Sequence, residues 1–170
     1  MKFYALFLST LLSSQVHSVF ALEPASAARI DEVARLGKHV MPFDLDKTLH
    51  IFSKTKTGGL QQVIAKDPRN HSQIKRIRTH LTKIAADFKQ ADFSDPEKIH
   101  GKNMPSLALL RQTQAGDMSI HYQALPNGAE ITYSTQKPEL ILAIHQWFDA
   151  QLNDHDRHAT MHSQHHMMMP

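Results

Sequence analysis

The pattern that most restricts the fold of this 170-residue chain is a unit that occurs twice. In each copy two strand-like runs flank a glycine turn, and an X-Pro step then leads into a segment with helical periodicity. The turns are Thr57-Gly58-Gly59 and Asn127-Gly128, and the X-Pro steps are Asp67-Pro68 and Lys137-Pro138. Such glycine pairs and Asn-Gly steps are typical of tight hairpins. The pattern predicts two ββα units, produced either by duplication or by chance recurrence of a common motif.

The segments that follow the X-Pro steps each carry one apolar face. Their apolar residues recur at steps of three and four, which predicts amphipathic helices that bury that face. These residues are Ile74, Ile77, Leu81, Ile84 and Phe88 in the first segment, and Ile141, Ile144, Phe148 and Leu152 in the second. The expected fold is therefore α+β, with an antiparallel sheet of about four strands and helices on one face.

The N-terminus has the features of a secretory signal. One lysine precedes an apolar run, and Val19-Phe20-Ala21 provides a cleavage site, so residues 1–21 are expected to be a signal peptide. The apolar run is too short to span a bilayer, which takes roughly 20 residues. We therefore expect a periplasmic or secreted protein with no stable membrane insertion after cleavage. Residues 22–40 are expected to be a lead segment outside the core, 41–152 a single α+β domain, and 153–170 a flexible tail rich in His and Met.

Composition restricts the chemistry of the chain. It has no cysteine, which excludes disulfides, thiolate zinc sites and cysteine nucleophiles. The net charge is only +3, and no aromatic residues alternate with the basic residues of the first helix, so no nucleic-acid partner is expected. The chain also has no G-x-S-x-G elbow, no P-loop and no dinucleotide glycine pattern. In contrast, the 13 histidines and 8 methionines provide ligands for soft metal ions.

Candidate metal ligands within the folded part fall into three groups. His80 and His145 each lie beside the apolar face of a predicted helix, and His100 and Met104 are four residues apart in a loop shaped by Gly101 and Pro105. The third group, His155 and His158, follows the last helix beside two aspartates, which are suitable partners for a metal-bound imidazole. Each group also has a structural interpretation: histidines at the edge of the core, a helix stop before a buried methionine, and a solvated helix end.

The last ten residues consist almost entirely of histidine and methionine. His162, His165 and His166 lie among Met161, Met167, Met168 and Met169. Imidazole and thioether together suit copper, and imidazole alone also suits zinc and nickel. We expect weak, exchangeable capture of an ion here, because a flexible segment loses entropy when it closes on a metal. The alternative is a low-complexity segment without function.

Several segments between Met41 and His158 resemble a family of small exported bacterial proteins that are often named aspartate carbamoyltransferase. The resembling segments include residues 77–81, 92–96, 99–105, 125–129 and 145–151, and the similar region covers about two-thirds of the chain. The resemblance implies no assigned activity, because the chain is too short for two-domain carbamoyl transfer and lacks a Ser-Thr-Arg-Thr phosphate loop. In the family pattern a glycine follows the Met-Pro pair, whereas this chain has Ser106.

The sequence thus favours an exported metal-binding protein, with copper as the first choice and zinc or haem as alternatives. Within the domain the expected ligands are His80, His100, Met104 and His145, with His155 as a further contributor. This neutral set would favour Cu(I). A second hypothesis is a small exported enzyme whose histidines act as acid–base groups or hold a catalytic metal. A third is a haem-binding or plain interaction module, and no protein partner is indicated.

Overall fold

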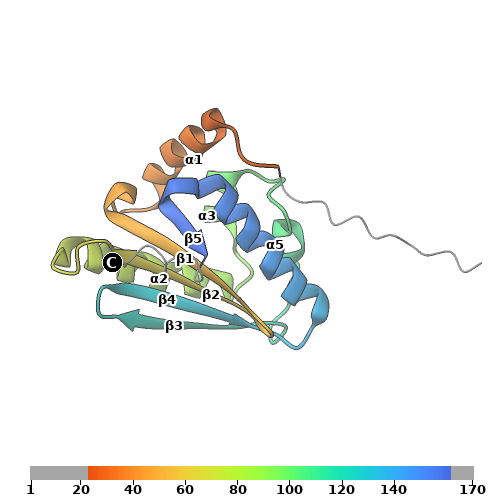
Figure 1. Ribbon diagram of the computed structural model, residues 1–170. Coiled ribbons are helices and arrows are strands. Elements are labelled where there is room, and N and C mark those ends of the chain that lie inside the picture. Colours follow the sequence, from red (N-terminus) through yellow and green to blue (C-terminus); the bar gives the residue numbers. More distant parts are fainter. Residues whose placement is uncertain (1–22, 162–170) are drawn as a thin grey trace, which may run out of the picture.

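The computed structural model describes residues 23–161. Its centre is a five-stranded sheet with the strand order β3-β4-β2-β1-β5 (Figure 1). The strands are β1 (Thr48–Thr55), β2 (Gly58–Ala65), β3 (Ser119–Leu125), β4 (Gly128–Ser134) and β5 (Ala159–Met161). The expected α+β class is confirmed. The sheet is mixed rather than purely antiparallel, because the short β5 pairs parallel to β1. That strand was not predicted, since three residues are too few to show a strand pattern.

The two predicted hairpins are present and join through β2 and β4. Pairing across this junction runs from Gly58 opposite Ser134 to Ile64 opposite Gly128. A Cβ atom added to Gly128 would lie 2.0 Å from the carbonyl oxygen of Val63, so only glycine allows the second hairpin to approach the first this closely. The two ββα units therefore form one continuous sheet.

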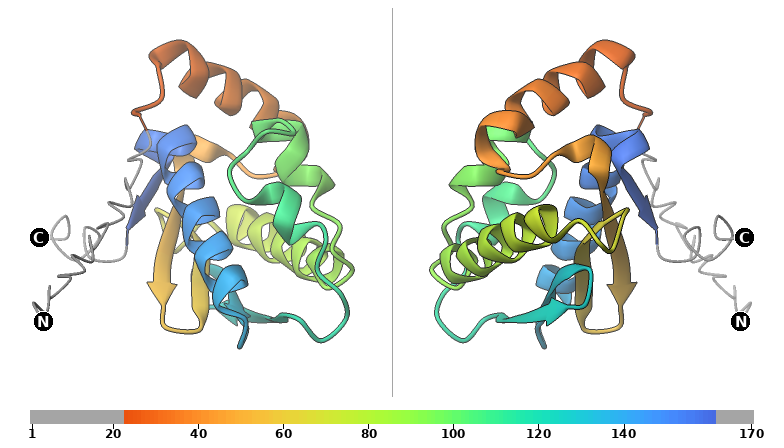
Figure 2. Two further views of the ribbon diagram at one scale, coloured as in Figure 1. Left: turned by 90° about the vertical axis from the view of Figure 1, so that its right-hand side faces the viewer. Right: turned by 90° about the vertical axis from the view of Figure 1, so that its left-hand side faces the viewer.

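The helices are α1 (Ala27–Val40), α2 (His71–Phe88), α3 (Ser94–His100), α4 (Leu107–Leu110) and α5 (Pro138–His155), with 3₁₀ turns η1 (Leu45–Lys47) and η2 (Asp156–His158). Asn70 caps α2 by accepting a hydrogen bond from the backbone N–H of Gln73, and Pro138 begins α5. Helix α2 packs mainly against β4 and β3, whereas α5 packs against β2, β5 and β1. Helix α1 lies across the end of the molecule above α3 (Figure 2).

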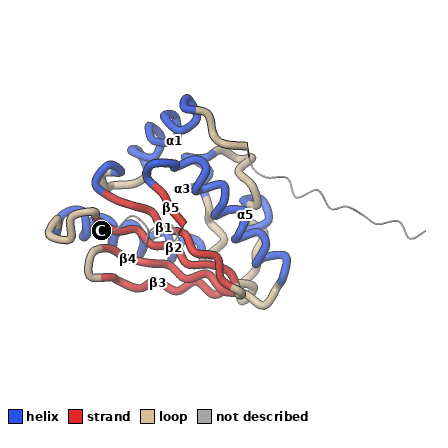
Figure 3. Tube along the Cα trace, viewed as in Figure 1, coloured by secondary structure: helices blue, strands red, loops and turns tan. Residues whose placement is uncertain are grey.

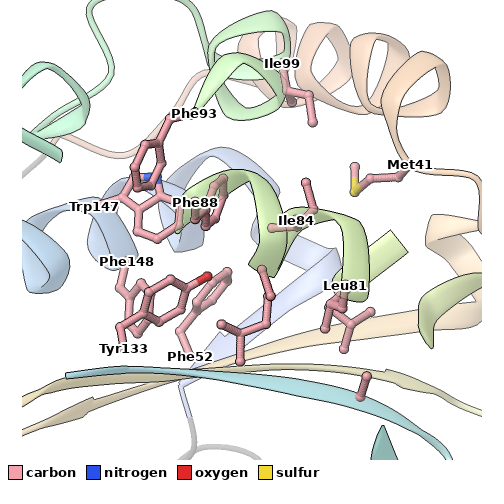
Figure 4. Packing of buried hydrophobic residues seen from close by; sticks show 14 of the residues in the cluster. Met41, Phe52, Leu81, Ile84, Phe88, Phe93, Ile99, Tyr133, Trp147 and Phe148 are labelled. Carbon is pink, nitrogen blue, oxygen red and sulfur yellow. The ribbon is translucent and has the colours of Figure 1, made fainter. Parts of the chain in front are cut away.

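Aromatic side chains pack between the helices and the sheet (Figure 4). Phe88 of α2 stacks on Phe93 at 4.2 Å between ring centroids, and Trp147 of α5 meets both rings edge-on. Such aromatic pairs add about 0.5–1.5 kcal/mol each beyond burial. Ile77, Leu81, Ile84 and Phe88 are all buried, as the helical periodicity predicts.

The folded unit extends beyond the expected limits of 41–152 at both ends. Helix α1, expected as a lead segment outside the core, buries Val33 to 1% exposure. Residues 153–161, expected to be part of a flexible tail, complete α5 and form η2 and β5. The expected signal peptide, residues 1–21, and the tail residues 162–170 lie outside the described residues. Within residues 23–161, no helix is both long enough and apolar enough to cross a membrane.

Candidate functional site

Four histidines from four different elements line one small cavity. His50 of β1, His80 of α2, His100 of α3 and His155 of α5 enclose a volume of about 50 Å³ beneath the end of α1. We call this the histidine cavity. Its lining also includes five further residues with a sulfur or polar group, Met41, Gln61, Asp95, Trp147 and Gln151. The cavity brings together imidazoles that are up to 105 residues apart in the sequence.

Three of these imidazoles form a contiguous row. The rings of His50 and His155 are parallel to within 4°, with centroids 5.2 Å apart, and His155 meets His100 edge-on at 5.0 Å. All three residues are buried, with exposures between 3% and 6%. The ring of Phe43 contacts both His50 and His80, at 5.8 Å and 5.6 Å. The row is therefore shielded from solvent by packing on several sides.

His100 is held in a fixed orientation by an aspartate and an arginine. Its Nδ1 lies 2.7 Å from Oδ2 of Asp154, and Arg29 donates to both oxygens of Asp154 and to the carbonyl of His100. Burial raises the pKa of Asp154, but hydrogen bonds from His100 and Arg29 outweigh burial and leave that pKa below its usual value. Asp154 is thus an acceptor, so a neutral His100 ring would carry its proton on Nδ1 and the free lone pair on Nε2.

His50, His80 and His155 are neutral at physiological pH. Burial, together with neighbouring His80, lowers the pKa of His50 to about 3, and burial lowers the pKa of His80 to about 4. Burial, followed by the proximity of His100 and His50, places the pKa of His155 well below its usual value. Neutral imidazole is the form that binds metal ions.

Two polar atoms at the cavity-lining residues have no hydrogen-bond partner. They are Nδ1 of His50 and Nε1 of Trp147, both fully buried. Leaving such an atom unpaired costs about 1–3 kcal/mol, and a bound ion or molecule is one way to recover that cost. Nδ1 of His50 offers a lone pair to such a ligand.

Met104 lines a different pocket from the histidine cavity. A second pocket of about 170 Å³ is lined by Met104, Asn103, Arg29 and Asp154, and His100 contributes to both spaces. The structure therefore places His100 and Met104 beside the same pocket, but Met104 does not line the histidine cavity.

The remaining predicted ligands lie elsewhere. Nε2 of His145 is 2.8 Å from the carbonyl of Gly58 and 3.0 Å from that of Thr55, so His145 ties α5 to the β1–β2 turn. This contact is the structural alternative that the sequence left open. His158 is buried, with Nε2 3.6 Å from Asp46, and it does not line the cavity. His162, His165 and His166 lie outside the described residues.

Sequence reasoning missed His50 as a site residue. The run Leu49–Thr55 was identified as a strand, and the two-residue period of a strand places His50 on the same face as Phe52. A histidine at an inward position of a strand was the available signal. Gln61 and Gln151 were missed too, because a lone glutamine carries no positional signature.

As the side chains stand in residues 23–161, no group of three His or carboxylate residues is arranged to hold one metal ion. An ion in the cavity would therefore have at most two His or carboxylate ligands in this arrangement. A third imidazole could bind it only if the rings moved closer to one another. Comparisons with protein-family models, with curated proteins and with solved structures found no match.

Proposed function

We propose that this chain is an exported metal-binding protein that holds one Cu(I) ion in the histidine cavity. The observation that carries the proposal is the convergence of four imidazoles on one buried space, three of them with pKa values below the usual value for histidine. Cu(I) accepts two nitrogen ligands in a linear arrangement, so the absence of a three-ligand cluster in the described residues does not oppose it. His50 and His155 are the proposed pair of ligands, and His100 lies beside them.

The charge of the cavity favours a monovalent ion over a divalent one. Its one acidic lining residue, Asp95, is already paired with Lys98 at 2.8 Å and Lys83 at 2.9 Å. The cost of burying an ion rises with the square of its charge, and no free carboxylate lines the cavity to compensate. Cu(I) therefore fits this environment better than Zn²⁺ does.

The size of the cavity favours an ion over a large cofactor. Sites for drug-sized ligands occupy about 300–1,000 Å³, whereas the histidine cavity measures about 50 Å³. A haem would require α2, α5 and the sheet to separate. A bare metal ion needs far less space than haem does.

The test is anaerobic Cu(I) loading of the full chain and of a chain ending at Met161, followed by measurement of retained copper. The shorter chain keeps all described residues and removes His162, His165 and His166, so the tail cannot supply the copper ligands. We expect one equivalent, lost in His50→Gln and in His155→Gln. His145→Gln, which changes a histidine of α5 outside the cavity, is the matched control. Retention of no copper by the shorter chain, or equal loss in all three variants, would contradict the proposal.

One observation favours an acid–base enzyme as a second candidate. Asp154 orients His100, and Nε2 of the neutral ring could then accept a proton from a substrate. Copper-free protein in which diethyl pyrocarbonate modifies His100 at Nε2 would favour this function over ion binding.

A further inference from the structure

Strand β3 forms an edge of the sheet that is open along its whole length. It pairs with β4 at every position from Ser119 opposite Ser134 to Leu125 opposite Gly128 (Figure 3). Among the described residues no strand pairs with its other side. The backbone N–H and C=O groups on that side form a template on which another strand can pair.

This edge lacks the features that usually prevent such pairing. Natural edge strands carry lysine or proline, contain a bulge, or are very short. Strand β3 has seven residues, Ser-Ile-His-Tyr-Gln-Ala-Leu, and none of them is Lys, Arg, Asp, Glu or Pro. Its register with β4 is unbroken, so it contains no bulge. The opposite edge differs, because β5 has only three residues.

Both ends of β3 are held in place by side chains from other elements. Arg78 of α2 donates to the carbonyl oxygens of Leu125 and Gly128 at the hairpin end. At the other end Asp117, two residues before the strand, accepts from Thr135 and pairs with Lys137. An edge that is already ordered loses little conformational entropy when it binds a partner.

We propose that β3 pairs antiparallel with β3 of a second copy, which joins the two five-stranded sheets into one across a twofold axis. With the axis at Tyr122, Ile120 lies opposite Ala124 of the partner copy, and His121 lies opposite Gln123. Because β3 carries no fixed charge, the twofold arrangement places no like charges opposite each other. Pairing would also cover Tyr122, which is half-buried, and Ala124, which is exposed on the same face as the core.

A second copy is the favoured occupant because its edge matches β3 in length, neutrality and rigidity. Main-chain pairing between two edges needs only strands of equal length and suitable direction. The interface is small, so we expect a reversible dimer in the micromolar range. This inference does not depend on metal binding.

The experiment is sedimentation equilibrium of the full chain over a range of concentrations. The double variant His121→Lys and Gln123→Lys opposes lysine to lysine across the axis, and should weaken the dimer at least about tenfold. Thr132→Lys is the matched control, because Thr132 lies beside His121 on the same face but on β4, one strand from the edge. Circular dichroism checks that each variant is folded.

We expect the wild type and Thr132→Lys to dimerise with similar dissociation constants, and the double variant to have a dissociation constant at least about tenfold higher. A wild type that stays monomeric at every concentration would overturn the proposal. So would a double variant that dimerises as tightly as the wild type, or a control that weakens the dimer as much as the double variant does.

Discussion

At the scale of single residues, the buried imidazoles make the stability of the protein depend on pH. The pKa values of His50 and His80, about 3 and about 4, lie below the usual 6.5. As pH falls below 6.5, the unfolded chain takes up protons that the folded chain does not. The stabilisation is thus present above pH 6.5 and is lost as pH falls toward 4. At pH 5 the free energy of unfolding should be lower than at neutral pH by about 2 kcal/mol for each of these histidines. The reason is that each pH unit below the pKa of the unfolded chain changes it by about 1.4 kcal/mol.

Urea unfolding of the metal-free chain at pH 7.5 and at pH 5 measures this loss. His50→Gln, which removes one of the titrating groups, should reduce the loss by about 2 kcal/mol. An equal free energy of unfolding at the two pH values would show that these imidazoles are not buried in the neutral form.

Ser106 is the second residue with a measurable consequence. Its φ of 64° lies in the left-handed region that favours glycine. Ser106 also donates a 2.7 Å hydrogen bond to Gln146, which a glycine would lose. Ser106→Ala loses the same bond but keeps the strain. Ser106→Gly should therefore be about 1 kcal/mol more stable than Ser106→Ala. Equal melting temperatures for the two variants would contradict this.

At the scale of elements, the distance between α5 and the sheet depends on a glycine of β2. A Cβ atom at Gly59 would lie 2.3 Å from the ring of Phe148. Gly59→Ala should therefore push α5 away from β2 and cost about 1–3 kcal/mol, the usual cost of overpacking a core. Gly116→Ala is the control, since a Cβ there meets nothing within 4 Å and only its φ of 90° opposes alanine. Chemical denaturation compares the two, and an equal loss in both would contradict the role of the Phe148 contact.

The elements with repeated local signals are the ones that the sequence predicted. The apolar face of α2 and both hairpin turns follow from spacing and from glycine and proline. Helix α1 was missed as part of the core because its one large, nearly fully buried residue, Val33, gives too weak a pattern. The end of the domain was placed too early, at residue 152, because the last buried residues of α5, Gln151 and His155, are polar. His50 was missed because a strand period shows which face a residue occupies, but not what lies opposite it.

At the scale of the whole molecule, the segments expected to lie outside the domain complete the site. Arg29 and Asp154, which fix His100, come from α1 and from the last turn of α5, and both lie outside residues 41–152. That shorter segment also lacks His155 and β5, so the edge of β1 loses its partner strand. The shorter segment loses the stacking of His155 on His50, the ion pair between Arg29 and Asp154, and the burial of Val33.

A chain of residues 23–161 should therefore unfold cooperatively, whereas residues 41–152 should lack cooperative unfolding. The lost contacts sum to several kcal/mol, and the total stability of a domain is only about 5–15 kcal/mol. Thermal unfolding followed by near-ultraviolet circular dichroism of Trp147, which lies in the core, reports on both chains. If residues 41–152 unfolded cooperatively with a melting temperature near that of residues 23–161, α1 and residues 153–161 would not be needed for the stability of the fold. The row of imidazoles would then need another explanation for its order, because its third member and the aspartate that orients His100 would both be dispensable to the fold.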